Sequence, residues 1–280
     1  MNLKDLLNSI KDEFQKCNID SPYLEAEIII SEVFEIERYK IYTEDIKVSE
    51  SEYKKIKELV EKRKKRIPLP YIIKKVHFYD CEFKIKKGIF IPRPETELLV
   101  EKTINIYNQY FYPKKVKILD IGIGCGNISI ALAKNIENCK VIGVDISKKS
   151  LKVACENAVL NKVEKKVKFL FSDLFENVND KFELIVSNPP YIREDEYEKL
   201  TEEIKKEPKK SLIGGKDGLK IIKKILKEAN YYLKKNGFLI IEIGYAQTKE
   251  IKKIIPQELI LFEVKKDFSS FDRIMVFKKI

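Results

Sequence analysis

Apolar side chains recur every three or four residues in the first part of the chain. Three stretches share this helical spacing of leucine, isoleucine, valine and phenylalanine: 2–16, 22–35 and 49–66. Ser21 is suited to cap the second stretch, because Pro22 follows it at the first helical position. The pattern therefore predicts a small helical domain over residues 1–72.

A different pattern begins where Pro68 and Pro70 break the helical spacing. Residues 76–92 alternate between apolar and polar side chains, which is typical of a β-hairpin, and Lys87-Gly88 is the expected turn. We therefore expect residues 73–92 to form a β-hairpin linker between two domains.

Strand-like apolar runs alternate with helical patterns across the third region, residues 93–280. The expected strands are 116–120, 140–145, 167–172, 182–187, 237–242 and 273–278, and the expected helices are 126–134, 148–161 and 219–233. This alternation predicts an α/β fold with a doubly wound, mainly parallel sheet. Ligands of such sheets bind at the carboxyl ends of the strands.

The charge changes this picture only slightly. The net charge is +11, but 49 of the 55 basic residues are Lys and six are Arg, whereas nucleic-acid readers rely more on Arg. Residues 1–66 hold 14 basic and 15 acidic side chains, so the excess of +12 lies on residues 67–280. A large negatively charged partner of the second part is plausible, but direct nucleic-acid binding is not expected.

Other composition features exclude several classes of protein. No apolar run approaches the roughly 18 residues of a membrane span, and the first 13 residues mix both charges, so we expect a cytoplasmic protein without a membrane partner. The five cysteines are scattered, which indicates buried free thiols and no disulfide framework. His77, the single histidine, lies in the expected hairpin, so neither a metal site nor a Ser-His-Asp hydrolase is expected.

A glycine-rich turn follows the first expected strand of the sheet. Gly122, Gly124 and Gly126 lack Cβ atoms and let the backbone approach a ligand, with Ile123 and Cys125 between them. The spacing is G-x-G-x-G and differs from the G-x-G-x-x-G of dinucleotide sites. By itself this turn is also compatible with a simple connection between a strand and a helix.

Acidic residues near the glycine turn favour a cofactor site. Asp145 ends the next expected strand, about 20 residues on, where a carboxylate can accept both hydroxyl groups of a ribose. Asp120 precedes the turn and would face the positively charged amino-acid end of S-adenosylmethionine. Asp173 and Leu174 follow the third expected strand. Together these positions predict S-adenosyl-L-methionine as the cofactor.

The tetrapeptide Asn188-Pro189-Pro190-Tyr191 follows an apolar strand of the same sheet. An amide nitrogen is a poor nucleophile because its lone pair is delocalised. The Asn188 side-chain oxygen and the Pro189 carbonyl can accept its two N–H bonds, while Tyr191 stacks on the flat group and Pro190 stiffens the turn. The pattern predicts methyl transfer to a planar nitrogen through positioning and electrostatics. The alternative is a rigid proline turn after a buried strand.

Several motifs, in this order, resemble those of the HemK-type protein-(glutamine-N5) methyltransferases over nearly the whole chain. The matching segments are 67–72, 90–97, 120–127, 187–192, 207–212 and 214–219. The resemblance implies methylation of the glutamine in the Gly-Gly-Gln motif of class I peptide chain release factors. It also implies that Phe90, Gly122 to Gly126, Asp145, Leu174 and Asn188 line the cofactor site and that Asn188 to Tyr191 line the glutamine pocket. Because one glutamine side chain offers too little surface to select a single site, we expect the helical domain over residues 1–72 to recognise the substrate protein.

Two other functions stay open at this point. An N6-adenine nucleic-acid methyltransferase shares the Asn-Pro-Pro-Tyr tetrapeptide, but it would normally need a target-recognition domain for base flipping, and no such insertion is evident. A non-catalytic adaptor that retains the cofactor fold is the other alternative. The intact Asn188 and Asp145 argue against it.

Overall fold

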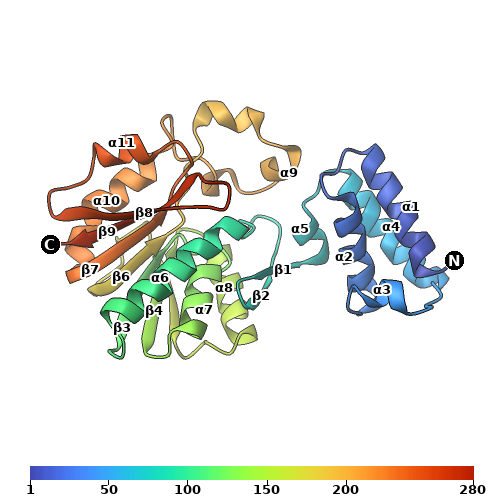
Figure 1. The fold of residues 1–280 in the computed structure, drawn as a ribbon, viewed down its shortest axis with the longest axis horizontal. Helices are drawn as coiled ribbons and strands as arrows, with labels where there is room; N and C mark the ends of the chain where they lie inside the picture. The colour runs from blue at the N-terminus through green and yellow to red at the C-terminus, as the bar shows by residue number, and fades with distance from the viewer. The chain divides into compact units, whose positions relative to one another are not determined.

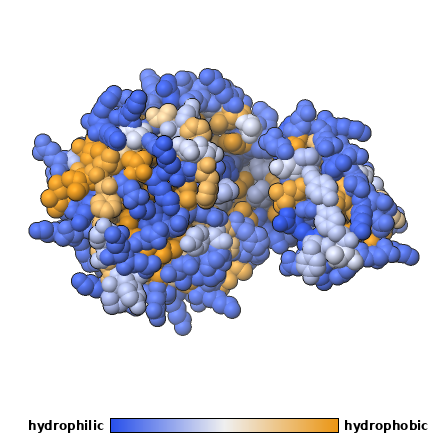
Figure 2. All heavy atoms as spheres, viewed as in Figure 1, coloured by the Kyte–Doolittle hydropathy of each residue, from blue (hydrophilic) through white to orange (hydrophobic).

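The computed structural model describes residues 1–280, and the chain divides into two compact units (Figure 1). The first comprises Met1–Lys74 together with Glu202–Lys206, and the second comprises Lys75–Thr201 and Glu207–Ile280. Hydrophilic side chains cover most of the face shown in Figure 2, with apolar side chains in scattered patches. No helix is both long enough and apolar enough to span a bilayer.

The first unit is helical apart from one isolated β-bridge between Asn2 and Lys47. Its helices are α1 (Leu3–Lys16), α2 (Pro22–Phe34), α3 (Lys40–Thr43), α4 (Glu50–Lys64), α5 (Leu69–Ile73) and α9 (Glu202–Lys205). The three predicted helices are confirmed, and α3, α5 and α9 are additional. Ser21 does precede α2, but its side chain makes no capping hydrogen bond, whereas Asn2 and Ser49 cap α1 and α4 through reciprocal side-chain bonds.

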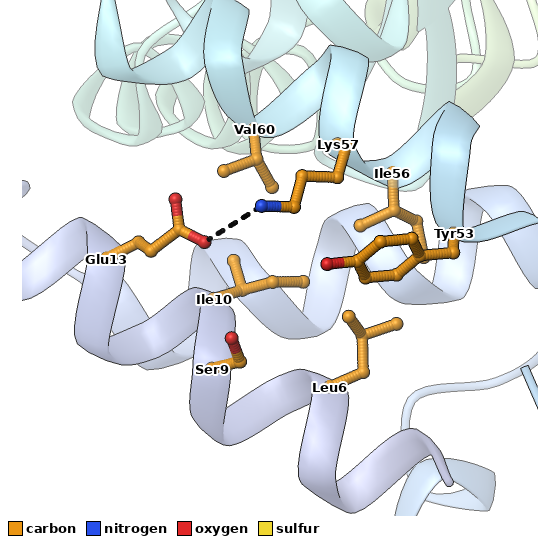
Figure 3. Close-up of a pocket in the computed structure, with 8 residues that line it drawn as sticks. All are labelled: Leu6, Ser9, Ile10, Glu13, Tyr53, Ile56, Lys57 and Val60. Atoms are coloured by element: carbon orange, nitrogen blue, oxygen red, sulfur yellow. Dashed lines mark ion pairs between the residues drawn. The ribbon is translucent and has the colours of Figure 1, made fainter. Parts of the chain in front are cut away.

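One small hollow of this unit lies between α1 and α4 (Figure 3). Apolar side chains from both helices line it, and the Lys57 ammonium lies 3.8 Å from the Glu13 carboxylate beside it. Helices that pack through apolar faces leave such seams. We therefore interpret this hollow as part of the helical packing.

The five consecutive basic residues 62–66 at the end of α4 are partly buried, although cations at a helix end are usually solvated. The Arg63 guanidinium is only 5% exposed and contacts two carboxylates, with Nε 2.5 Å from Glu25 and Nη1 2.9 Å from Glu203. Arg66 also lies 2.9 Å from Glu203. These ion pairs attach residues 202–206 to the helical unit.

The second unit is built on a seven-stranded sheet with the order β5-β4-β3-β6-β7-β9-β8. The strands are β3 (Val116–Ile121), β4 (Cys139–Asp145), β5 (Val167–Phe171), β6 (Phe182–Ser187), β7 (Leu233–Glu242), β8 (Leu259–Lys266) and β9 (Asp272–Lys279). β9 is antiparallel to both neighbours, and the other pairs are parallel. The predicted doubly wound, mainly parallel sheet is confirmed, with β8 as an unpredicted edge strand.

Helices cover both faces of this sheet. The main ones are α6 (Glu97–Tyr110), α7 (Asn127–Asn135), α8 (Lys148–Leu160), α10 (Lys220–Tyr232) and α11 (Thr248–Lys252). Leu119, Ile185 and Leu239 pack in one cluster with Ile222 and Ile225 of α10. The strand residues that alternate with them, such as Ile118, Leu184 and Ile240, are also fully buried, so the other face is covered as well. Figure 1 shows α6, α7 and α8 beside one another.

The predicted β-hairpin is present, but its turn lies earlier in the chain than predicted. β1 (Lys75–Phe78) pairs with β2 (Cys81–Lys84), so the chain turns at Tyr79-Asp80, and Lys87-Gly88 lies beyond the hairpin. The Asn157 side chain on α8 bonds to the backbone N–H and C=O of Lys84, which attaches the hairpin to the second unit.

The cysteines and the histidine differ partly from expectation. Cys81, Cys125 and Cys139 are buried as predicted, but Cys17 is half-buried and Cys155 is exposed on α8. All five thiols are free. His77 is exposed on β1, where its imidazole lies 3.7 Å from Glu82. No group of His, Cys, Asp and Glu in the chain could hold a metal ion.

Candidate active site

The glycine turn connects the carboxyl end of β3 to the first residue of α7. Gly122 and Gly126 have φ values of +77° and +86°, in the left-handed region that L side chains rarely adopt. A Cβ atom on Gly122 would meet no atom within 4 Å, so open space lies beside this backbone. A Cβ atom on Gly126 would lie 3.0 Å from Ala154 Cβ, so this glycine permits close packing of α7 against α8.

Asp145 lies beside the turn because β4 and β3 are parallel neighbours that end at the same edge. Its two carboxylate oxygens accept the backbone N–H groups of Gly124 (3.0 Å) and Ser147 (2.8 Å). Burial raises the pKa of Asp145, and these two hydrogen bonds oppose the shift. Each carboxylate oxygen has a second acceptor position for a ligand hydroxyl.

Asp120 is fully buried at the end of β3. The Ser129 hydroxyl donates to its Oδ2 atom at 2.6 Å, while its Oδ1 atom has no hydrogen-bond partner. Burial raises the pKa of Asp120 to about 7. A buried carboxylate oxygen without a donor is costly, so this atom fits a cationic or N–H-bearing ligand group reached directly or through water.

The other predicted cofactor residues differ in accessibility. A Cβ atom on Gly124 would lie 4.0 Å from the Cβ of Phe90, so Phe90 lies beside the turn, and the Arg93 guanidinium lies over its ring. Asp173 is exposed and Leu174 is half-buried against the sheet core, both just after β5. Ile123 and Cys125 are buried, so the turn offers a ligand their backbone and not their side chains.

The Asn188-Pro189-Pro190-Tyr191 loop follows β6 at the same edge of the sheet. Residues 212–218 pack against this loop. The Ile192 N–H donates to the Leu212 carbonyl, and the Gly214 N–H donates to the Ile192 carbonyl. A Cβ atom on Gly214 would lie 2.6 Å from the Pro190 carbonyl oxygen. The loop therefore has a fixed backbone and leaves little room for rearrangement.

A buried polar network joins this loop to the end of β7. The Asn188 Nδ2 atom donates to the Thr96 hydroxyl at 2.9 Å, and that hydroxyl donates to the Glu242 carboxylate at 2.6 Å. The Tyr191 hydroxyl lies 3.3 Å from the other Glu242 oxygen. Burial raises the pKa of Glu242 to about 7, while the Thr96 hydrogen bond and the charge of Arg273 oppose the shift.

Several residues of this site have contacts that no single sequence motif predicts. Thr96 lies in the Ile-Pro-Arg-Pro-Glu-Thr-Glu segment, and Glu242 ends a predicted apolar strand, where an ionisable side chain is a recognisable signal. Gln247 donates from Nε2 to the Tyr191 carbonyl at 3.0 Å. Glu207 accepts the Ile91 N–H at 2.9 Å and pairs with Arg93, although both partners are distant from it in sequence.

Comparison with known proteins defines the class first. A model of the methyltransferase small domain matches residues 94–216. A solved methyltransferase from Pyrococcus furiosus superposes with a TM-score of 0.55 and 20% identity over 72% of this chain and 90% of its own. The ribosomal protein L11 methylase of Lactobacillus delbrueckii subsp. bulgaricus gives a TM-score of 0.50 and 20% identity over 67% and 80%. The fold and the site define an S-adenosylmethionine-dependent methyltransferase.

The family follows from relatives that match the whole chain. A model of the PrmC N-terminal domain matches residues 5–73. Release factor glutamine methyltransferases from Thermodesulfovibrio yellowstonii and Dictyoglomus turgidum are 39% and 38% identical, over 91% and 98% of this chain and 92% and 97% of theirs. The one from Fusobacterium nucleatum is 41% identical over 98% of this chain and 78% of its own. The chain belongs to the family of release factor glutamine methyltransferases.

The site fits S-adenosylmethionine by the chemistry of its own atoms. The open space beside Gly122 admits a ligand against the backbone, Asp145 offers acceptors for hydroxyl groups, and Asp120 holds an unpaired buried oxygen. Phe90 and Leu174 add apolar surface near the strand ends. These residues would hold the cofactor, which supplies a methyl group on a positively charged sulfur.

Proposed function

We propose that this protein methylates the side-chain amide nitrogen of the glutamine in the Gly-Gly-Gln motif of class I peptide chain release factors. The arrangement of Asn188 supports this proposal. Its Nδ2 atom is engaged by Thr96, which leaves its Oδ1 atom as an acceptor at the edge of the sheet where the cofactor residues gather. A substrate amide presents N–H donors, so an acceptor is the group that its recognition needs.

The residues of the loop have complementary roles in this reaction. The Asn188 oxygen and the Pro189 carbonyl accept the two N–H bonds of the glutamine amide and fix the orientation of its nitrogen. The loop's fixed backbone keeps both acceptors in place before the substrate binds. Tyr191 is held by Glu242 and packs against the sheet core. Catalysis then depends on orientation and preorganised dipoles.

The test of this function is to locate the transferred methyl group. The protein is incubated with labelled S-adenosylmethionine and an intact class I release factor, and mass spectrometry of the digest should place the label on the Gly-Gly-Gln glutamine. Asn188→Ala should lower turnover by about 10²-fold or more, the scale of losing a preorganised polar group. Labelling of adenine in duplex DNA, with none on the protein, would favour the nucleic-acid alternative.

We further propose that the helical unit recognises the release factor. A single glutamine side chain offers too little surface to select one site among many proteins, so specificity needs contacts elsewhere. The unit exposes Tyr23, Tyr39 and Tyr42, and exposed tyrosines are common anchors of protein interfaces. None of the candidate cofactor or glutamine-binding residues lies in it.

This proposal is tested by comparing two substrates. Tyr39→Ala, at a side chain that is 61% exposed, should lower kcat/KM for the intact release factor by about fivefold or more, the usual effect of removing an interface anchor. It should leave activity on a short Gly-Gly-Gln peptide unchanged. Tyr231→Ala on α10, at a 70% exposed tyrosine of the other unit, is the matched control. Equal loss on both substrates would contradict a recognition role.

A further inference from the structure

Two hydrogen bonds connect Asn188 through Thr96 to Glu242 at the buried end of β7. Asn188 Nδ2 is 2.9 Å from Thr96 Oγ1, and Thr96 Oγ1 is 2.6 Å from Glu242 Oε2. Thr96 and Glu242 are each 1% exposed, so bulk water does not compete for these groups. Neither Thr96 nor Glu242 contributes one of the proposed acceptors for the glutamine amide. Their contribution is therefore indirect.

The donors and acceptors along this series of hydrogen bonds are fixed. An ionised carboxylate can only accept, so the single Thr96 hydroxyl proton is committed to Glu242. Thr96 Oγ1 can then only accept from Asn188, and the atom that faces it must be the amide nitrogen. The Asn188 amide is therefore held with its oxygen pointing away from Thr96.

We propose that Thr96 and Glu242 are positioning residues that keep the Asn188 oxygen available as the acceptor for the substrate amide. This inference rests on the proposed function, because it assumes that Asn188 binds a glutamine N–H. With the amide flipped, Asn188 would present N–H donors to a substrate nitrogen that also carries N–H donors. The two groups would then repel each other.

The groups around Glu242 support the ionised form that this polarity requires. The Tyr191 hydroxyl, 3.3 Å away, can donate to the second oxygen, and the charge of Arg273 favours ionisation. Arg273 is itself held by Asp267, 3.0 Å away. Burial, the largest cause, acts in the opposite sense and raises the pKa of Glu242 to about 7, and the negative charge of Glu95 adds to this shift, so the ionised form prevails above about pH 7.

A double-mutant cycle tests whether Thr96 acts through Asn188. The variants are Thr96→Val, which removes the hydroxyl at nearly constant volume, Asn188→Ala, and the double variant, all assayed for kcat with labelled S-adenosylmethionine and a release factor. Thr96→Ser restores a hydroxyl. Thr103→Val is the matched control, because Thr103 is a fully buried threonine on α6 whose hydroxyl bonds only to the Leu99 carbonyl.

We expect Thr96→Val to lower kcat by about tenfold or more, on the scale of a misplaced polar group, with S-adenosylhomocysteine affinity within about threefold of wild type. Thr96→Ser and Thr103→Val should stay within about threefold. The double variant should be no slower than Asn188→Ala alone, because a residue that acts through another loses its effect when that other is absent.

Three results would overturn the proposal: a loss of less than about threefold in Thr96→Val, an equal loss in Thr96→Ser, or multiplication of the two single effects in the double variant. Failure of the proposed function looks different. In that case Asn188→Ala would keep full turnover or the label would not be on a glutamine, and both proposals would be withdrawn.

Discussion

Replacing Asp145 with alanine should weaken cofactor binding without unfolding the second unit. The carboxylate ends β4, next to the glycine turn, and its oxygens accept the Gly124 and Ser147 backbone N–H groups at 3.0 and 2.8 Å. Each oxygen retains one acceptor position, which is the number needed for the two hydroxyl groups of a ribose. Alanine removes both positions and also leaves the Gly124 and Ser147 N–H groups without this acceptor.

The size of the effect follows from these contacts. A hydrogen bond to a charged group contributes about 1.5–3 kcal/mol, and water that enters the space recovers part of it. The expected loss of binding free energy is about 1–3 kcal/mol, which corresponds to about a 5- to 150-fold increase in Kd. Asp145→Asn keeps one oxygen and should lie between wild type and alanine.

Calorimetric titration with S-adenosylhomocysteine measures this loss directly. Asp180→Ala is the matched control, because Asp180 pairs with Lys117 near the amino end of β3, away from the strand ends that form the site. Thermal unfolding should show that each variant is folded at the assay temperature. If Asp145→Ala bound S-adenosylhomocysteine with wild-type affinity, Asp145 would only be a structural residue that holds the turn.

Two further predictions concern stability. Arg63→Met leaves the half-buried Glu25 carboxylate without its partner and Glu203 with Arg66 alone, so it should lower the free energy of unfolding by about 1.5–3 kcal/mol. Arg38→Met, at a half-exposed pair with Glu27, should cost less than about 1 kcal/mol by denaturant titration. Equal losses would contradict the burial argument. The pKa of Asp120 is about 7 in the folded protein, well above its value in the unfolded chain. The folded state therefore binds more protons than the unfolded state between about pH 4 and pH 7, and the free energy of unfolding should fall as the pH rises through this window. Asp120→Asn should flatten the dependence of Tm on pH, and an unchanged slope would mean that Asp120 ionises normally.

Periodicity was sufficient to predict the elements that bury one continuous apolar face. The helices near residues 2–16, 22–35 and 49–66 follow from apolar side chains at helical spacing, and six of the seven strands of the large sheet follow from short apolar runs. β8 was not predicted, and its position at the edge of the sheet is defined only by the sheet order. The hairpin turn was predicted at Lys87-Gly88 because glycine is typical of turns, whereas the observed turn, Tyr79-Asp80, contains no glycine.

The candidate site likewise contains some residues that sequence motifs predict and others that only the fold brings together. The glycine turn, Asp145 and the Asn188 loop are continuous motifs, and parallel strand order brings them to one edge of the sheet. The hydrogen bond between Thr96 and Glu242 joins residues that are 146 positions apart, so no local sequence pattern could predict it. The burial of Arg63 likewise depends on Glu203, 140 positions away, a partner that the local sequence around Arg63 does not reveal.

The chain passes between its two units three times, after Lys74, after Thr201 and after Lys206. A gene fragment that encodes residues 1–74 therefore lacks Glu203, and Arg63 retains only Glu25 as its acidic partner. A fragment that begins at Lys75 carries residues 202–206 without the helices they pack on. The helical unit is thus not a transferable module, and an exchange between homologous enzymes must transplant both segments together.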